Sequence, residues 1–95
     1  MLKEATTPSI SRRVPLVVRA PKAMDVRVTG DFTGWGQRGI RLSHDGSGRW
    51  RTVLNLEPGE YQYRLLVDGA WEDHAEAGLR VPNPFGSKNC VLNVL

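Results

Sequence analysis

Short apolar runs with a period of two constrain the fold of this chain more than any other feature of its sequence. Residues 24–29 alternate, and Met24, Val26 and Val28 are predicted to face the core. Trp50 is in phase with the leucines that follow it and is predicted to lie in the core as well. Glycine, proline, aspartate and asparagine separate the runs, and no stretch has sustained helical periodicity. We therefore predict an all-β fold, an antiparallel β-sandwich of about seven to eight short strands.

The chain of 95 residues divides into a tail and one domain. Residues 1–13 are polar and are interrupted by Pro8, so we predict a flexible N-terminal tail there. Residues 14–95 carry the strand pattern and are long enough for a single core. Cys90 is the only cysteine, which excludes an internal disulfide, and its apolar neighbours predict a buried structural thiol.

The distribution of charge argues against nucleic acid as a partner. Of the formal net charge of +3, residues 1–13 contribute +2, and the rest of the chain is nearly balanced. No apolar stretch approaches the roughly 18 residues that span a bilayer, and the first twenty residues lack a signal-peptide core. We expect no membrane partner and a cytoplasmic location.

No catalytic constellation is visible in the sequence. Cys90 has no paired base and is a poor nucleophile candidate. A glycosidase would need two carboxylates that flank a cleft, but Asp68 is explained by the Asp-Gly turn that it begins. The carboxylates that follow it are predicted to lie on a solvated loop. We therefore predict that the protein is not an enzyme.

Metal and cofactor sites are equally poorly supported. His44 and His74 are distant in sequence and lack the spacing of metal ligands. Gly34 and Gly36 follow a predicted strand but open no helix, so a dinucleotide fingerprint fails on its context. We predict neither a metal nor a cofactor.

Two tryptophans stand where the strand pattern breaks into turns. Trp35 ends the glycine-containing run 30–35, and Trp71 follows the turn residues Asp68 and Gly69. Both are candidates for exposed loop positions, although each ring could instead fold back as a lid on the end of the sandwich. Arg64 lies between them in sequence, on the predicted outward face of its strand. This pair of aromatic residues with a cation favours recognition of a sugar or a base.

A glucose ring matches this set of side chains physically. Its C–H faces suit a flat indole, and its rim of hydroxyl groups needs guanidinium or amide partners. Lys88 and Asn89 precede the last predicted strand and are plausible suppliers of such contacts. Asn89 could instead be a turn residue that satisfies its own backbone.

Three blocks in order resemble a known family. They are VRVTGDFTGW at 26–35, GRW at 48–50 and PGEYQYRLLVDGAW at 58–71. They are similar to the early-set domain of isoamylase-type enzymes and to the family 48 carbohydrate-binding modules, which include the glycogen-binding domain of the beta subunit of AMP-activated protein kinase. The resemblance covers residues 14–95 and implies an immunoglobulin-like, early-set sandwich that binds α-1,4-linked glucans without catalysis.

The resemblance also implies roles for individual residues. Trp35 and Trp71 match the two stacking tryptophans, and Arg64 stands where the family has a lysine that bonds the sugar. Asn89 matches an asparagine that contacts glucose hydroxyl groups. Phe85 replaces a protruding leucine and Ser87 replaces a threonine, while Lys88 is the residue between Ser87 and Asn89.

One departure from the family pattern follows Trp71, where Glu72 and Asp73 replace the usual Asp-Pro. We expect binding of glycogen, starch or maltooligosaccharides, with a glucan-active enzyme or a regulatory protein as a further partner. The alternative is a module of the same fold that docks on another protein and does not bind sugar.

Overall fold

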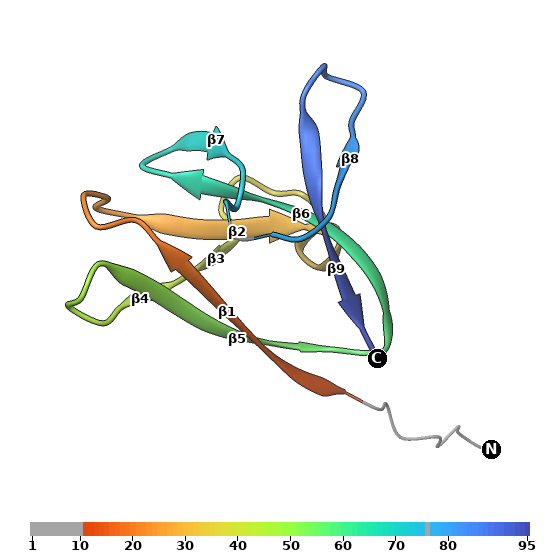
Figure 1. Cartoon of the computed structure of the whole chain (residues 1–95), viewed down its shortest axis with the longest axis horizontal. Coiled ribbons are helices and arrows are strands. Elements are labelled where there is room, and N and C mark those ends of the chain that lie inside the picture. Colours follow the sequence, from red (N-terminus) through yellow and green to blue (C-terminus); the bar gives the residue numbers. More distant parts are fainter. Residues whose placement is uncertain (1–10, 76) are drawn as a thin grey trace.

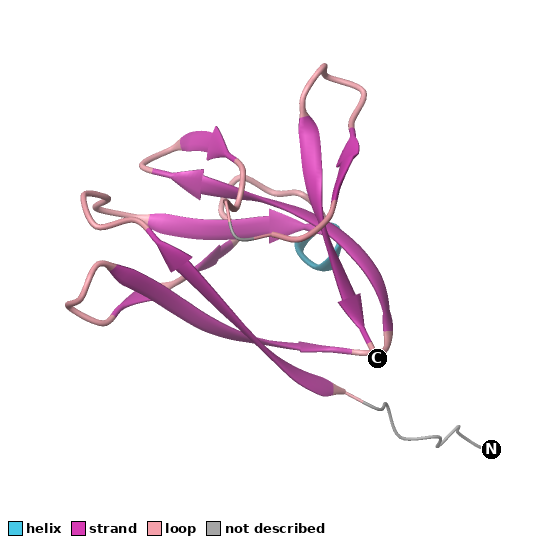
Figure 2. Ribbon diagram, in the orientation of Figure 1, coloured by secondary structure: helices cyan, strands magenta, loops and turns pink. Residues whose placement is uncertain are grey.

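The computed structural model describes residues 11–75 and 77–95, and within them the fold is all-β. Strands make up most of this part of the chain, together with one short 3-10 helix (Figure 2). The elements are β1 (Arg12–Arg19), β2 (Val26–Gly30), η1 (Asp31–Thr33), β3 (Ile40–Arg41), β4 (Ser43–His44), β5 (Arg49–Leu56), β6 (Gly59–Val67), β7 (Ala70–Glu72), β8 (Arg80–Pro82) and β9 (Lys88–Val94). The predicted fold class is confirmed.

The strands form two antiparallel sheets (Figure 1). The smaller sheet has the order β1-β5-β4, and the larger has the order β3-β2-β6-β9-β8, with β7 added beside β6. The nine strands of the described residues exceed the seven or eight predicted. One of the additional strands is β8, which lies in a segment that looked irregular because its prolines and glycines obscure a three-residue edge strand.

The start of the folded part differs from the sequence-based boundary. Residues 1–10 of the predicted tail lie outside the described residues. Arg12 and Arg13 were assigned to the tail, but they belong to β1, where they pair with Leu56 and Asn55 of β5.

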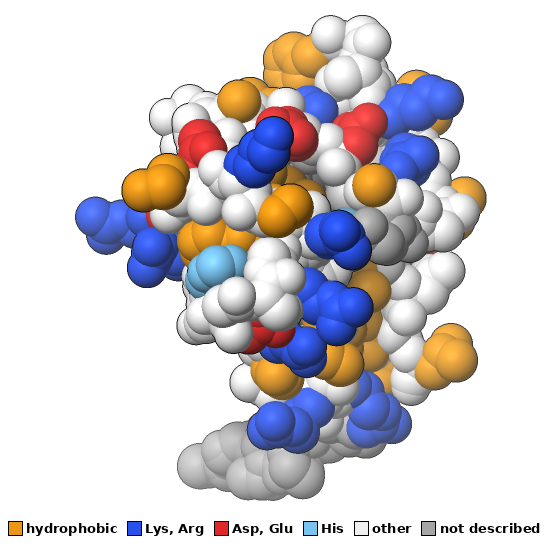
Figure 3. Space-filling model, turned by 60° about the vertical axis from the view of Figure 1, so that its left-hand side comes forward, with side chains coloured by type: hydrophobic (Ala, Val, Ile, Leu, Met, Phe, Trp, Pro, Cys, Tyr) orange, Lys and Arg blue, Asp and Glu red, His pale blue; other side chains and the backbone are white. Residues whose placement is uncertain are grey.

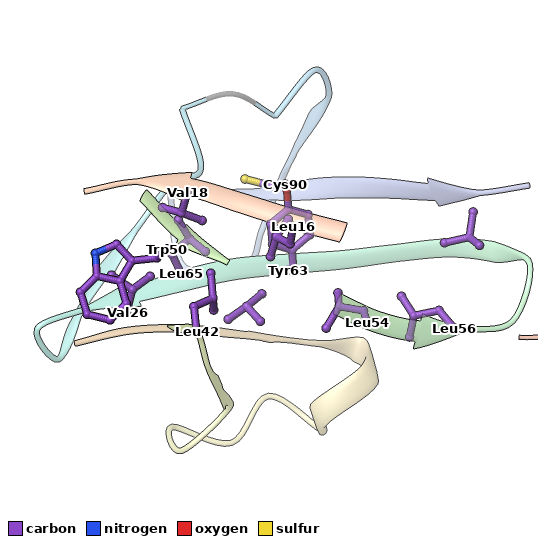
Figure 4. Close-up of a cluster of buried hydrophobic side chains, with 12 residues drawn as sticks. Leu16, Val18, Val26, Leu42, Trp50, Leu54, Leu56, Tyr63, Leu65 and Cys90 are labelled. Atoms are coloured by element: carbon purple, nitrogen blue, oxygen red, sulfur yellow. The ribbon is translucent and has the colours of Figure 1, made fainter. Parts of the chain in front are cut away.

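Apolar side chains from both sheets meet in one core (Figure 4). Trp50 of β5 is 4% exposed, as predicted, and its indole Nε1 donates a hydrogen bond to the carbonyl oxygen of Ala20 at 3.1 Å. Val26 and Val28 of β2 are fully buried, and so is the free thiol of Cys90. Burial of each large side chain of this kind stabilises the fold by roughly 1.5–3 kcal/mol.

Met24 does not face the core, so this part of the prediction is wrong. Its side chain is 81% exposed. The backbone N–H groups of Met24 and Asp25 both donate to Oδ1 of Asp68, at 2.8 and 2.9 Å. These bonds hold Met24 in the turn before β2, which begins only at Val26, and the alternation therefore does not reach it.

His74, which the sequence singled out only as a weak candidate metal ligand, connects the two sheets. It is 6% exposed, its Nε2 lies 2.9 Å from the carbonyl oxygen of Val17 in β1, and its Nδ1 lies 2.8 Å from the hydroxyl group of Tyr63 in β6. Because a carbonyl oxygen can only accept, Nε2 is the donor to Val17, and Nδ1 shares the second hydrogen bond with the hydroxyl group of Tyr63. This buried pair of hydrogen bonds fixes β1 against the larger sheet.

The carboxylate of Asp25 bridges two arginines and reduces the repulsion between them. Arg27 of β2 and Arg41 of β3 lie directly opposite each other in the strand register. The guanidinium groups of both residues donate to the carboxylate of Asp25 at 2.8 Å. These hydrogen bonds, that of Arg27 first, hold the pKa of the Asp25 carboxyl group below its usual value.

Replacement of the core indole tests this packing. Trp50→Ala should lower the free energy of unfolding by roughly 3–5 kcal/mol, because it leaves a cavity and removes the bond to Ala20. Val53→Ala on the same strand is the matched control and should cost no more than about 0.5 kcal/mol, since Val53 is 43% exposed. Chemical denaturation measures both values, and equal effects of the two variants would contradict the assignment of the core.

The ion pairs of Asp25 with Arg27 and Arg41 predict that the stability of the fold depends on pH. A carboxyl group whose pKa is lower in the folded state stabilises the fold above its unfolded pKa of about 3.9, and this stability is lost as the pH falls through the folded pKa. The wild type should therefore melt at a higher temperature than Asp25→Asn at pH 6. The difference should shrink as the pH falls toward 2, and a difference that is constant with pH would contradict the prediction.

Candidate functional site

A cleft of about 600 Å3 opens on the outer face of the larger sheet, between β7 and the loop that joins β8 to β9. Its lining combines aromatic rings, one arginine and several amide or hydroxyl side chains: Trp35, Arg64, Trp71, Asn83, Pro84, Phe85, Ser87 and Asn89. The structure thus brings six of the seven site residues predicted from the sequence into one cleft, although they lie on four different segments.

Lys88 is the predicted site residue that does not line the cleft. It is exposed and pairs with Pro82, as the first residue of β9. Successive residues of a strand point to opposite faces, so the orientation that brings Asn89 into the cleft turns Lys88 away from it.

The backbone after β2 positions Trp35. Gly34 and Trp35 both have a positive φ, 68° and 62°, which turns the chain sharply after η1. The indole Nε1 donates to Oδ1 of Asp31 at 3.0 Å, while Oδ2 of the same carboxylate accepts the backbone N–H of Gln62 at 2.7 Å. Asp31 therefore holds the ring of Trp35 in a defined place beside β6.

Trp71 and Arg64 approach each other across the β6–β7 hairpin. Trp71 pairs with Leu66 and is 40% exposed, whereas Leu66, on the same outer face, is buried. The guanidinium carbon of Arg64 lies 5.8 Å from the centroid of the Trp71 ring, within the range of a cation–π contact. The guanidinium group of Arg64 thus packs over the ring of Trp71.

The guanidinium group of Arg64 is held on both sides. Its terminal nitrogens donate to Oγ of Ser87 and to Oδ1 of Asp73, each at 3.3 Å. The Arg64 side chain is only 16% exposed, and among the described residues its Nε has no hydrogen-bond partner. Asp73 was predicted to lie on a solvated loop, and its contact with Arg64 was not predicted.

Asn83 organises the loop that carries Phe85. Its Oδ1 accepts hydrogen bonds from the backbone N–H groups of Phe85 and Ser87 at 3.0 and 3.2 Å, and from Oγ of Ser87 at 3.1 Å. Its Nδ2 lies 2.8 Å from Oγ of Ser87 and donates to Oδ1 of Asn89 at 3.0 Å. A single amide side chain thereby ties three residues of the cleft together.

Sequence reasoning missed Asn83, although a signal was present. Asn83-Pro84 is a turn-forming pair followed two residues later by Gly86, and this pattern is typical of an ordered turn before the last strand. The bond from Nδ2 of Asn89 to Oε1 of Gln62, at 3.0 Å, crosses from β9 to β6 and has no local signal. Only the strand pairing reveals it.

The cleft has the chemistry of a binding surface. Its lining residues include no carboxylate, histidine or cysteine, so the described residues place no general acid–base pair there. Nowhere in residues 11–75 and 77–95 does a group of three or more His, Cys, Asp or Glu side chains lie together as a possible metal site. No helix of the described chain is long and apolar enough to cross a membrane.

Comparison with known proteins agrees with this geometry. The family described as the glycogen recognition site of AMP-activated protein kinase matches residues 15–95. The chain is 33% identical over 90 residues to the chloroplastic phosphoglucan phosphatase LSF1 of Arabidopsis thaliana. The aligned region covers 95% of this chain and 15% of that protein. It is 31% identical over 70 residues to 5'-AMP-activated protein kinase subunit beta-1 of Sus scrofa. Here the aligned region covers 74% of this chain and 54% of that subunit.

A third relative is the chloroplastic protein FLOURY ENDOSPERM 6 of rice, 33% identical over 94 residues, or 98% of this chain and 17% of that protein. The chain thus spans about half or less of the length of these relatives. The resemblance predicted from the sequence is confirmed. Since the match includes every strand from β2 to β9 and most of β1, the chain belongs to the family of the glycogen recognition site of AMP-activated protein kinase.

Proposed function

We propose that the cleft binds a segment of an α-1,4-linked glucan, such as glycogen, starch or a maltooligosaccharide. The observation that carries the proposal is the convergence of Trp35, Trp71 and Phe85 with a hydrogen-bonded set of polar side chains in one cleft of about 600 Å3. Sites for small ligands commonly have this size and this mixture of apolar walls and few polar groups. Membership of a glycogen recognition family supports the same ligand class.

Trp35 and Trp71 would form the stacking platform. An indole ring offers a flat, polarizable surface and loses little conformational entropy on binding, which suits the C–H face of a glucose unit. Both rings are already restrained, Trp35 through Asp31 and Trp71 through its place in β7 beside Arg64. Restraint before binding lowers the entropic cost of the complex.

Arg64, Ser87 and Asn89 would supply the polar contacts. Their side chains are bonded to one another or to neighbours at 2.8–3.3 Å, so each presents its remaining hydrogen-bonding capacity in a fixed direction. Sugar hydroxyl groups both donate and accept, and can therefore share these bonds without leaving a buried polar group unpaired.

Phe85 would add an apolar contact at the mouth of the cleft. It is 90% exposed at the end of the loop that Asn83 organises. A phenyl ring held so far into solvent carries an unfavourable hydration cost, which contact with a sugar face would remove.

We further propose that the domain acts without catalysis and brings a glucan-active or regulatory protein to the polymer. Because the cleft is shallow and open, one site should bind modestly. Several sites along one polymer would strengthen the attachment through effective concentration.

Removal of either tryptophan tests the platform. Trp71→Ala and Trp35→Ala should each weaken binding of maltoheptaose and β-cyclodextrin by about 1–3 kcal/mol, because each loses one stacking surface. Isothermal titration calorimetry measures the affinities, and far-UV circular dichroism shows that the variants are folded. Met24→Ala is the control, since Met24 is 81% exposed and does not line the cleft.

Two results would contradict this assignment. A folded Trp71→Ala variant that binds both sugars like the wild type would remove Trp71 from the site. A wild-type protein that binds neither sugar at millimolar concentration would refute glucan binding altogether.

Replacement of Asn83 tests the organisation of the loop. Asn83→Ala should weaken binding of the same sugars by about 0.5–1.5 kcal/mol, because the loop of Phe85 and Ser87 must then be ordered on binding. Amide hydrogen exchange at Ser87 should become faster, as its N–H loses its acceptor. Asn93→Ala, at an exposed position of β9, is the control, and a similar loss of affinity in both variants would contradict the role of Asn83.

A further inference from the structure

The outer face of the smaller sheet carries a concentration of arginines. Side chains that alternate with the core residues of β1 and β5 form this arginine face: Arg13, Val17 and Arg19 from β1, and Arg49, Arg51 and Val53 from β5. Figure 3, which brings the left side of Figure 1 forward, shows blue side chains among orange ones over the lower part of the molecule, with little red. The arginine face and the cleft lie on the outer faces of different sheets.

The register of the two strands places like charges opposite each other. Arg19 pairs directly with Arg49, an arrangement that destabilises an antiparallel pair. The same fold contains a second pair of this kind, Arg27 with Arg41, but there Asp25 bonds both guanidinium groups. Among the described residues, no ion pair joins Arg19 or Arg49 to a carboxylate. Within this part of the chain, the repulsion between Arg19 and Arg49 is therefore not offset by a carboxylate, whereas Asp25 offsets the repulsion between Arg27 and Arg41.

Among residues 11–75 and 77–95, carboxylates reach the arginine face only at its margins. Asp45, in the β4–β5 turn, bonds Arg51 at 3.1 Å. Three carboxylates share with Arg19 the lining of a second cavity of about 390 Å3: Asp68, Glu72 and Asp73. The face therefore has a positive charge excess among its described residues.

Apolar side chains occupy the centre of the same face. Val17 and Val53 are 38% and 43% exposed, and arginines lie before and after them along this face, which also includes Pro15 and Asn55. An apolar centre with arginines around it is typical of protein interfaces, where Arg is enriched and forms bidentate bonds to carboxylates. A neutral glucan offers no negative charge to this face, and a second copy would bring the same positive charge against it.

We propose that the arginine face docks an acidic segment of a partner protein. Its carboxylates would bond Arg49, Arg19 and Arg51, and an apolar side chain between them would cover Val17 and Val53. Because this surface and the cleft lie on different sheets, docking goes beyond the glucan function and does not depend on it. The partner's carboxylate would take the place between Arg19 and Arg49 that Asp25 takes between Arg27 and Arg41.

The binding test uses a synthetic peptide in which glutamate alternates with valine and leucine, and a peptide with glutamine in place of glutamate. Amide NMR shifts of the labelled chain should change in β1 and β5 with the acidic peptide only. Arg49→Gln combined with Arg51→Gln should lower the affinity at least tenfold, whereas Arg38→Gln combined with Lys88→Gln removes the same charge elsewhere and should leave it unchanged. Affinity for maltoheptaose should not change in any of these variants.

Several outcomes would overturn the proposal. One is the absence of amide NMR shift changes up to millimolar acidic peptide, and another is shift changes that lie outside β1 and β5. A third is an equal loss of peptide affinity in the two double variants. Binding of inorganic polyphosphate but not of the peptide would indicate a polyanion site instead. A dimer in sedimentation velocity that Arg49→Gln dissociates would indicate an interface between copies of the chain.

A second measurement tests the charge argument without a partner. At low salt, Arg49→Gln should melt at a higher temperature than the wild type, because it relieves the repulsion of Arg19. The difference should disappear in concentrated salt, which screens exposed charges. Arg41→Gln, which loses a bond to Asp25, should instead melt at a lower temperature. A lower melting temperature for Arg49→Gln at low salt would show that its charge is already compensated within the chain, and would overturn the proposal.

Discussion

The alternation of side chains along β6 supports both the core and the cleft. This strand lies at the centre of the larger sheet, where it pairs with β2, β7 and β9. Tyr63 and Leu65 point into the core, while Gln62 and Arg64 point to the outer face. A slip of one residue would exchange these two sets of side chains. The free energy of core packing therefore also fixes the register in which the polar residues reach the cleft.

Residues whose environment follows from the strand period were predictable. Trp50, Val26 and Val28 are buried as the alternation indicates, and the two blocks that end in Trp35 and Trp71 meet at one site. The error at Met24 lies where a distant side chain overrides the local pattern. Met24 leaves the core side because Asp68, 44 residues away, captures its backbone N–H. A local window contains no information about such a bond.

Part of the cleft depends on contacts of this distant kind. Asp31 bonds the backbone of Gln62 31 residues away, and Asn89 bonds the Gln62 side chain across 27 residues. Residue types together with the family resemblance could identify the aromatic and polar candidates, but not the bonds that orient them. Asn83 is the exception, because its loop is local and its turn-forming sequence could have predicted an organising role.

The two outer faces of the sandwich use different physical interactions. In the cleft, Arg64 is largely buried and already has Asp73 and Ser87 as partners, so the proposed glucan would bind there mainly by stacking and neutral hydrogen bonds. On the arginine face the guanidinium groups are exposed, and their charge is compensated only at the margins. Salt screens exposed charges strongly and leaves apolar contact intact. Binding at the two faces should therefore respond differently to ionic strength: salt would weaken the proposed contact at the arginine face and would leave stacking in the cleft largely unchanged.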